Sequence, residues 1–150
     1  MFINQEFFDR IEPVLIELKE KLKSEFVVFG STPLYLLGVL EIKKGSDFND
    51  IDIAIRDASV IPEEAKTVYF RGDPNQKLYK IKIKDINVDI GSAWPGQEEI
   101  FDKIFKEPIV VKGFNFANLD ICQEWKELMV EKYNREKDKH HLEKIKEKIN

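Results

Sequence analysis

The chain has 150 residues, a length that suits one ordinary domain and is too short for two well-packed ones. Hydrophobic residues make up 43% and charged residues 35%, a balance typical of a chain that folds rather than stays disordered. The formal net charge of -4 argues against neutralisation of nucleic-acid phosphates by the domain as a whole.

The sequence shows neither an apolar run long enough to cross a bilayer nor a secretory signal at its acidic start, MFINQEFFDR. We therefore expect a cytoplasmic protein with no membrane partner. The single cysteine, Cys122, cannot form an internal disulfide, which suits a reducing compartment. Its apolar neighbours Ile121 and Trp125 predict a thiol packed in the core rather than a nucleophile.

Apolar residues recur at three- and four-residue steps between residues 4 and 24 and predict an amphipathic helix. Pro13 interrupts this pattern, so either the helix kinks there or a second helix begins. The apolar run 26–29 then predicts a buried strand.

The strand is followed by Gly30 and Ser31, which predict a tight turn. Ser31 or Thr32 is the natural N-cap of the next helix, with Pro33 at its first position. This helix is apolar nearly all round, so we expect it to be buried and to end near Lys43. The segment KKGSDFND, residues 43–50, is predicted to be a turn-rich loop.

Asp50 and Asp52 alternate with the three isoleucines of the segment 50–55. A strand places successive side chains on opposite faces, so both carboxylates share one face and the isoleucines the other. Asp89 lies in a similar alternation near the end of a predicted hairpin, residues 78–90, whose turn is at 84–85. We therefore expect three carboxylates from two strands to converge.

The remaining segments complete a mixed pattern. We predict a connection at 57–66, a short strand at 67–70, a turn cluster at 71–77, a loop at 91–96, a helix at 97–105, a strand at 108–112, a helix at 119–133 and a last amphipathic helix ending near Ile149. Strands in the middle with helices around them predict an α/β or α+β class, with a mixed central sheet flanked by helices. We expect a single domain, with a core at about 1–115 and C-terminal helices at about 119–149.

Three convergent carboxylates suit a hard divalent cation such as Mg²⁺ or Mn²⁺, which takes oxygen ligands and often shares them with a substrate phosphate. A Gly-Ser turn before a helix suits the phosphate itself, since backbone N–H groups there are accessible. Each motif alone is common in proteins without such a site. The order of the motifs and the third acid together favour a site for metal and phosphate.

In these three motifs, VVFGS, NDIDI and INVDI, the sequence resembles the nucleotidyltransferase superfamily that includes DNA polymerase beta. The resemblance covers the first strand to about Ile90 and implies the nucleotidyltransferase fold with a C-terminal helical extension. It implies that Gly30 and Ser31 hold the terminal phosphates of a nucleoside triphosphate. It also implies that Asp50 and Asp52 bind the metals, and that Asp89 completes the metal site and helps to remove the proton of the attacking hydroxyl.

The segment YNREKDKHHL, residues 133–142, resembles the Arg-x-Lys-Asp segment of small stand-alone nucleotidyltransferases, among them antibiotic-modifying enzymes and toxin-antitoxin proteins. The resemblance implies that Arg135, Lys137 and Asp138 border the nucleotide or acceptor side of a cleft. The alternative is a solvated charged junction between two helices. His140 and His141 are predicted to be exposed rather than catalytic.

Two features depart from that family's pattern. Many stand-alone relatives carry an arginine just before the acid pair, where this chain has SDFN, which leaves Lys43 or Lys44 as substitutes. The large helical domain of bigger members has no counterpart here, so the acceptor either sits at a subunit interface or is small.

Our first hypothesis is an enzyme that transfers a nucleoside monophosphate from a nucleoside triphosphate to a hydroxyl with Mg²⁺. The alternative is an inactive module of the same fold that binds a nucleotide or partners a toxin. A phosphohydrolase would need a positioned general base, which the sequence does not identify. The acceptor (small molecule, protein or RNA end), the preferred base and the presence of a homo-oligomer stay open.

Overall fold

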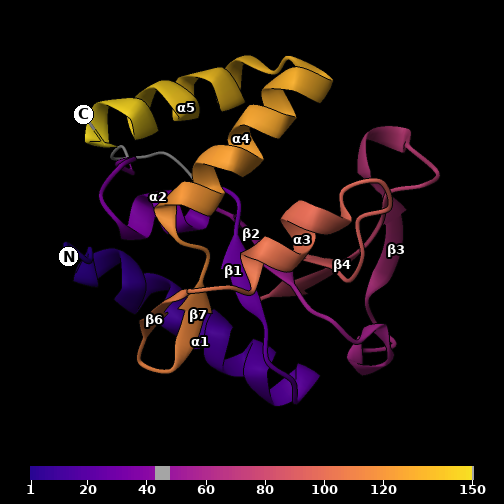
Figure 1. Ribbon diagram of the computed structural model, residues 1–150. Coiled ribbons are helices and arrows are strands. Elements are labelled where there is room, and N and C mark those ends of the chain that lie inside the picture. Colours follow the sequence, from indigo (N-terminus) through magenta and orange to yellow (C-terminus); the bar gives the residue numbers. More distant parts are fainter. Residues whose placement is uncertain (43–47, 150) are drawn as a thin grey trace.

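The computed structural model describes residues 1–42 and 48–149. Within this part of the chain, seven strands form one mixed sheet in the order β3-β4-β5-β2-β1-β7-β6, with helices on both faces (Figure 1). The predicted class, a mixed central sheet flanked by helices, is confirmed. The helices are α1 (Gln5–Leu22), α2 (Thr32–Leu36), α3 (Glu98–Ile104), α4 (Leu119–Tyr133) and α5 (Glu136–Ile149). The strands are β1 (Val27–Phe29), β2 (Asp50–Ala54), β3 (Lys66–Tyr69), β4 (Lys77–Ile83), β5 (Ile86–Gly91), β6 (Ile109–Val111) and β7 (Phe114–Phe116).

Helix α1 runs through Pro13 as one element, so no second helix begins there. Its N-terminus is capped by Asn4, whose side-chain oxygen accepts a hydrogen bond from the Phe7 backbone N–H. The helix ends where Lys23 takes a left-handed conformation, with φ of 51°. Its apolar stripe packs against one face of the sheet, as the periodicity predicts.

Helix α2 ends at Leu36, so the prediction that it extends to about Lys43 is wrong. The cause is Gly38, whose φ of +74° is open to glycine at little cost. At this turn the Val39 and Leu40 N–H groups both donate to the Leu34 carbonyl, which closes the helix. The apolar residues of this segment are nevertheless buried, as predicted. Most of the predicted loop at 43–50, including Lys43 and Lys44, lies outside the described residues.

The order of the central strands positions the acids. Strand β1 pairs antiparallel with β2, and β2 pairs parallel with β5. In the second pairing Asp52 lies opposite Asp89. The isoleucines at 51, 53 and 55 are fully buried on the other face, in the core that α1 covers, as the alternation predicts.

Two hairpins frame these strands. The predicted turn between β4 and β5 is confirmed at Lys84 and Asp85, both with positive φ, a combination that suits a two-residue turn. Of the second hairpin, only the first strand, β6, was predicted. Strand β7 follows it after a tight turn at Gly113 and was missed. Strand β7 lies parallel to β1 and buries Phe114 and Phe116 in the core under α1.

Helices α3, α4 and α5 cover the face of the sheet opposite α1, where they form a second apolar core (Figure 1). Cys122 of α4 is buried in this core, as predicted, and burial raises the pKa of its thiol to about 12. Among residues 1–42 and 48–149, the longest apolar stretches of helix fall short of what a membrane span requires.

Candidate active site

Three carboxylates lie on the sheet face that α3 and α4 cover. Asp50 and Asp52 are two residues apart on β2, and Asp89 lies beside Asp52 on the parallel strand β5. On the far side of Asp89, Lys80 of β4 is its register partner, and its Nζ lies 3.5 Å from Asp89 Oδ1. Asp52 and Asp89 therefore lie side by side, and Asp50 shares their sheet face.

These carboxylates raise one another's affinity for protons. The pKa of Asp52 is raised to about 7, first by burial and then by the charges of Asp89 and Asp50. The pKa of Asp89 is also raised by burial, against the opposing effect of Lys80. The positive charge near these carboxylates is therefore too small to balance their negative charge.

Gly30 and Ser31 form the turn between β1 and α2, directly beside Asp52. The φ of Gly30 is +74°, and a Cβ atom added there would lie 2.5 Å from Asp52 Oδ2. Only glycine lets the turn and the acid come this close. The turn and the carboxylates are thus parts of one site.

The Ser31 hydroxyl does not cap α2, and the helix has only five residues, so its dipole contributes little. The hydroxyl instead accepts a hydrogen bond from Lys126 Nζ at 3.1 Å and lies 3.4 Å from His141 Nδ1. Positive charge at this turn comes from a lysine of α4 rather than from the predicted helix N-terminus.

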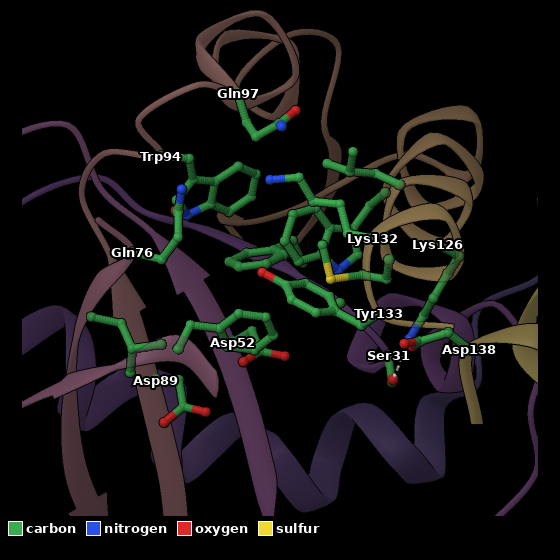
Figure 2. A pocket seen from close by; sticks show the side chains of 18 of the residues that line it. Ser31, Asp52, Gln76, Asp89, Trp94, Gln97, Lys126, Lys132, Tyr133 and Asp138 are labelled. Carbon is green, nitrogen blue, oxygen red and sulfur yellow. Dashed lines mark hydrogen bonds and ion pairs between the residues drawn. The ribbon is translucent and has the colours of Figure 1, made fainter. Parts of the chain in front are cut away.

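Lys126 is buried, and its Nζ also donates to Asp138 Oδ1 at 3.0 Å. Arg135 Nε lies 3.2 Å from the other carboxylate oxygen, so Asp138 joins two cations. Burial lowers the pKa of Lys126, and Asp138 opposes that effect. Figure 2 shows Lys126 and Asp138 beside Ser31, at the opposite side of the cavity from Asp89.

His141 is buried, so the prediction that it is exposed is wrong, whereas His140 is exposed as predicted. On α5 the residues 138, 141 and 145 share one face, and the packing of α5 against α4 buries all three. Burial, followed by the charges of Lys126 and Lys137, lowers the pKa of His141 to about 3. Its ring is therefore neutral at pH 7.

A cavity of about 290 Å³ joins the acids to the Gly-Ser turn and to α4. All of the site residues that the sequence predicts line it: Gly30, Ser31, Asp50, Asp52, Asp89, Arg135, Lys137 and Asp138. The junction between α4 and α5 is only partly solvated, because Asp138 is buried while Lys137 is exposed at the rim.

Sequence reasoning missed Lys126, Lys80 and the aromatic wall formed by Trp94, Trp125 and Tyr133. One signal was present for Lys126. It lies four residues after Cys122 and three before Met129, both buried, so it occupies the apolar stripe of α4. A lysine on such a stripe is a candidate for a buried, paired charge.

The chain was compared with known proteins. Neither the protein-family models, nor the curated proteins, nor the solved structures gave a match. What the site does is therefore argued from its own geometry.

Within the described residues, no group of three or more His, Cys, Asp or Glu side chains is arranged so that it could hold a metal ion by itself. The donors would fit a hard cation if water and substrate phosphate completed its ligands, since Mg²⁺ seldom relies on an all-protein cage. Asp89 Oδ1 is buried and makes no hydrogen bond among the described residues, although Lys80 Nζ lies 3.5 Å from it. An oxygen of this kind, beside a second carboxylate with a raised pKa, is a suitable ligand for such a cation.

Proposed function

We propose that the protein is a Mg²⁺- or Mn²⁺-dependent nucleotidyltransferase that moves a nucleoside monophosphate from a nucleoside triphosphate to a hydroxyl acceptor. The observation that carries this proposal is the joining of two groups in one cavity. The carboxylates of β2 and β5 lie beside a Gly-Ser turn that is backed by a buried lysine. Acids alone suit many sites, whereas acids beside a cationic phosphate cradle suit phosphoryl and nucleotidyl transfer.

Each part of the cavity has a role in this reaction. Ser31 and Lys126 would hold the terminal phosphates, and Asp50, Asp52 and Asp89 would hold the cation. When bound, the cation neutralises charge on the reacting phosphate and makes the acceptor hydroxyl more acidic. The acceptor oxygen then bonds to the α-phosphorus, and the bond to pyrophosphate breaks. A carboxylate with a raised pKa, as at Asp89, is suited to take the hydroxyl proton.

We place this activity in the cytoplasm, where nucleoside triphosphates are abundant and an unpaired thiol such as Cys122 stays reduced. The acceptor is a small molecule, a protein or an RNA end. A second copy of the chain or a toxin partner could supply the acceptor side.

One observation favours the alternative, an inactive module that binds a nucleotide or partners a toxin. Lys80 Nζ lies 3.5 Å from Asp89 Oδ1, so a side-chain cation already stands at the third acid. Against it, three neighbouring carboxylates cost stability, and a module without catalysis gains nothing by keeping them. The transferase is therefore the stronger proposal.

The test is to incubate the protein with each labelled nucleoside triphosphate and Mg²⁺ and to measure pyrophosphate release. We expect release in the wild type and its loss, by at least ~100-fold, in Asp50→Ala and Asp52→Ala. Asp102→Ala is the matched control, because Asp102 is an exposed acid whose ion pair with Arg56 lies outside the cavity. Tight nucleotide binding with no pyrophosphate release would support the inactive module and reject the transferase.

A further inference from the structure

Two residues beyond the carboxylates on each strand, the same sheet face carries small residues instead of acids. Ala54 follows Asp52 by two residues and Gly91 follows Asp89 by two, and these two small residues are register partners. They lie on the same face as the acids, about 7 Å further along the strands. The Trp94 indole lies above Gly91, since a Cβ added there would lie 2.8 Å from Trp94 Nε1.

Trp94 is half of an aromatic pair. Its ring stacks on Trp125 of α4, with centroids 4.5 Å apart and planes at 29°. Phe29 meets both indoles edge-on, at 5.0 Å and 5.4 Å between centroids, and so fixes their position. Both indoles are only partly buried, and both line the cavity that holds the acids.

The surroundings of this pair suit a flat polar ring. Gln97 projects into the cavity near Trp94 (Figure 2), and its amide offers both a donor and an acceptor. Gln76 ties the β3–β4 loop to the loop that carries Trp94, through a hydrogen bond of 2.7 Å to the Pro95 carbonyl. Tyr133 adds an aromatic wall from the end of α4. Together they form an aromatic-walled pocket with polar groups at its edge.

We propose that the Trp94–Trp125 pair is the nucleobase subsite, on which the base of the nucleoside triphosphate stacks. This inference rests on the proposed function. The terminal phosphates belong at Ser31 and Lys126, and the α-phosphate belongs at the carboxylates, so the nucleoside extends away from both. The row of Ala54 and Gly91 lies in that direction, and the step of about 7 Å from the acids leaves room for a ribose between them.

The experiment uses the two tryptophans as their own reporters, since the chain contains only Trp94 and Trp125. The full chain is titrated with ATP, CTP, GTP and UTP in turn, and with inorganic triphosphate, all with Mg²⁺. We expect a saturable change in tryptophan fluorescence with at least one nucleotide. Inorganic triphosphate should displace that nucleotide without producing the change itself.

A variant then tests the stack directly. Trp94→Leu should weaken nucleotide binding, measured by calorimetry, by roughly 5- to 100-fold, the effect of losing one stacked base. Its affinity for inorganic triphosphate should stay within about twofold of the wild type. Trp94→Phe keeps a smaller ring and should give an intermediate loss, which covers the case in which the leucine variant does not fold. Phe105→Leu is the matched control, because Phe105 packs in the same apolar core but does not line the cavity.

Several outcomes would overturn the subsite. They are nucleotide binding with no fluorescence change, an equal change with inorganic triphosphate, and an equal loss of both affinities in Trp94→Leu. Nucleotide binding with no fluorescence change would assign the indoles to the acceptor site or to the core. The subsite and the transferase also fail separately. If nucleotides change the fluorescence but no pyrophosphate is released, the subsite proposal stands and the transferase proposal is rejected. If Trp94→Leu releases pyrophosphate as fast as the wild type, the transferase proposal stands and the subsite proposal is rejected.

Discussion

Two groups of charge line the same cavity, and the structure treats them in opposite ways. At Lys126 each cation has a carboxylate partner, since Asp138 lies between this lysine and Arg135. The pKa of Asp52 is raised by burial and by the charges of Asp89 and Asp50, which Lys126 and Lys137 oppose only in part. The first group is paired within the protein and keeps a net positive charge, whereas in the second group the carboxylates repel one another.

The comparison distinguishes the residues that fix the geometry of the site from the residues that would act in its function. A buried ion pair with good hydrogen bonds fixes the position of its members, so Lys126 is held ready at the Ser31 hydroxyl. Clustered acids with raised pKa values cost stability, and such groups concentrate at functional sites. Four substitutions test this contrast.

The largest effect is expected from breaking the Lys126–Asp138 pair. Lys126→Met leaves a buried carboxylate with one partner fewer and should lower the free energy of unfolding by about 3–5 kcal/mol in urea titrations. The control is Lys103→Met, which removes an exposed ion pair with Glu124 and should cost less than about 1 kcal/mol. Equal costs for the two variants would show that the buried pair is not structural.

Asp52→Asn should raise the free energy of unfolding rather than lower it. The pKa of Asp52 in the folded protein, about 7, lies above the ordinary aspartate value of 3.8, so between these two pH values the folded state binds a proton that the unfolded state does not. That stabilisation is complete below pH 3.8 and is lost as the pH rises through 7. At pH 8 the asparagine variant should therefore be more stable than the wild type by about 1–3 kcal/mol. Thermal unfolding without divalent cation checks this, and a less stable variant at pH 8 would contradict it.

His141 should show the reverse pH dependence. Its pKa in the folded protein, about 3, lies below the ordinary histidine value of 6.5, so the unfolded state binds the proton first as the pH falls. The resulting stability is present above pH 6.5 and is lost as the pH falls toward 3. His141→Gln should remove about 1–2 kcal/mol of the stability difference between pH 7 and pH 5. His140→Gln, at an exposed position, should leave the pH profile unchanged, and equal profiles for the two variants would contradict the burial of His141.

The smallest effect is expected at Lys80. Lys80→Met removes a partly exposed ion pair and should change the free energy of unfolding by less than about 1 kcal/mol. Because Lys80 would compete with the proposed cation for Asp89, its loss should tighten Mg²⁺ binding in calorimetry by roughly two- to fivefold. Lys82→Met is the control, since Lys82 is exposed on the same strand and does not line the cavity. Weaker Mg²⁺ binding in Lys80→Met would mean that the lysine helps to build the site.

The acidic side of the cavity was predictable because short local patterns determine it. The alternation around Asp52 and that around Asp89 each fix which face a carboxylate takes. What brings the two faces together is the parallel pairing of β2 with β5, which the sequence patterns did not predict, although they predicted that the acids converge. The Gly30 turn was predictable for the same reason, since glycine after a strand signals a tight turn.

The Lys126 side was only partly predictable: its place on the apolar stripe of α4 indicates burial, but its partners depend on how α5 packs on α4. In sequence Lys126 is one of many lysines, and His141 belongs to a charged run that resembles a solvated surface. Two local features were also misjudged. Gly38 ends α2 within an apolar run, where no polar residue marks the end of a helix. Strand β7 has only 3 residues, too few for an alternating pattern to identify it.

The contacts of Ser31 also bear on how the protein is made. This residue meets Lys126 across 95 positions of sequence and His141 across 110. Contacts of such long range form late, because a large loop of chain must close before they contribute. During synthesis the strands that carry the acids leave the ribosome well before α5 does. These contacts of Ser31, which belong to the proposed phosphate site, are therefore completed only near the end of folding, and a nascent chain lacks them until α5 has docked.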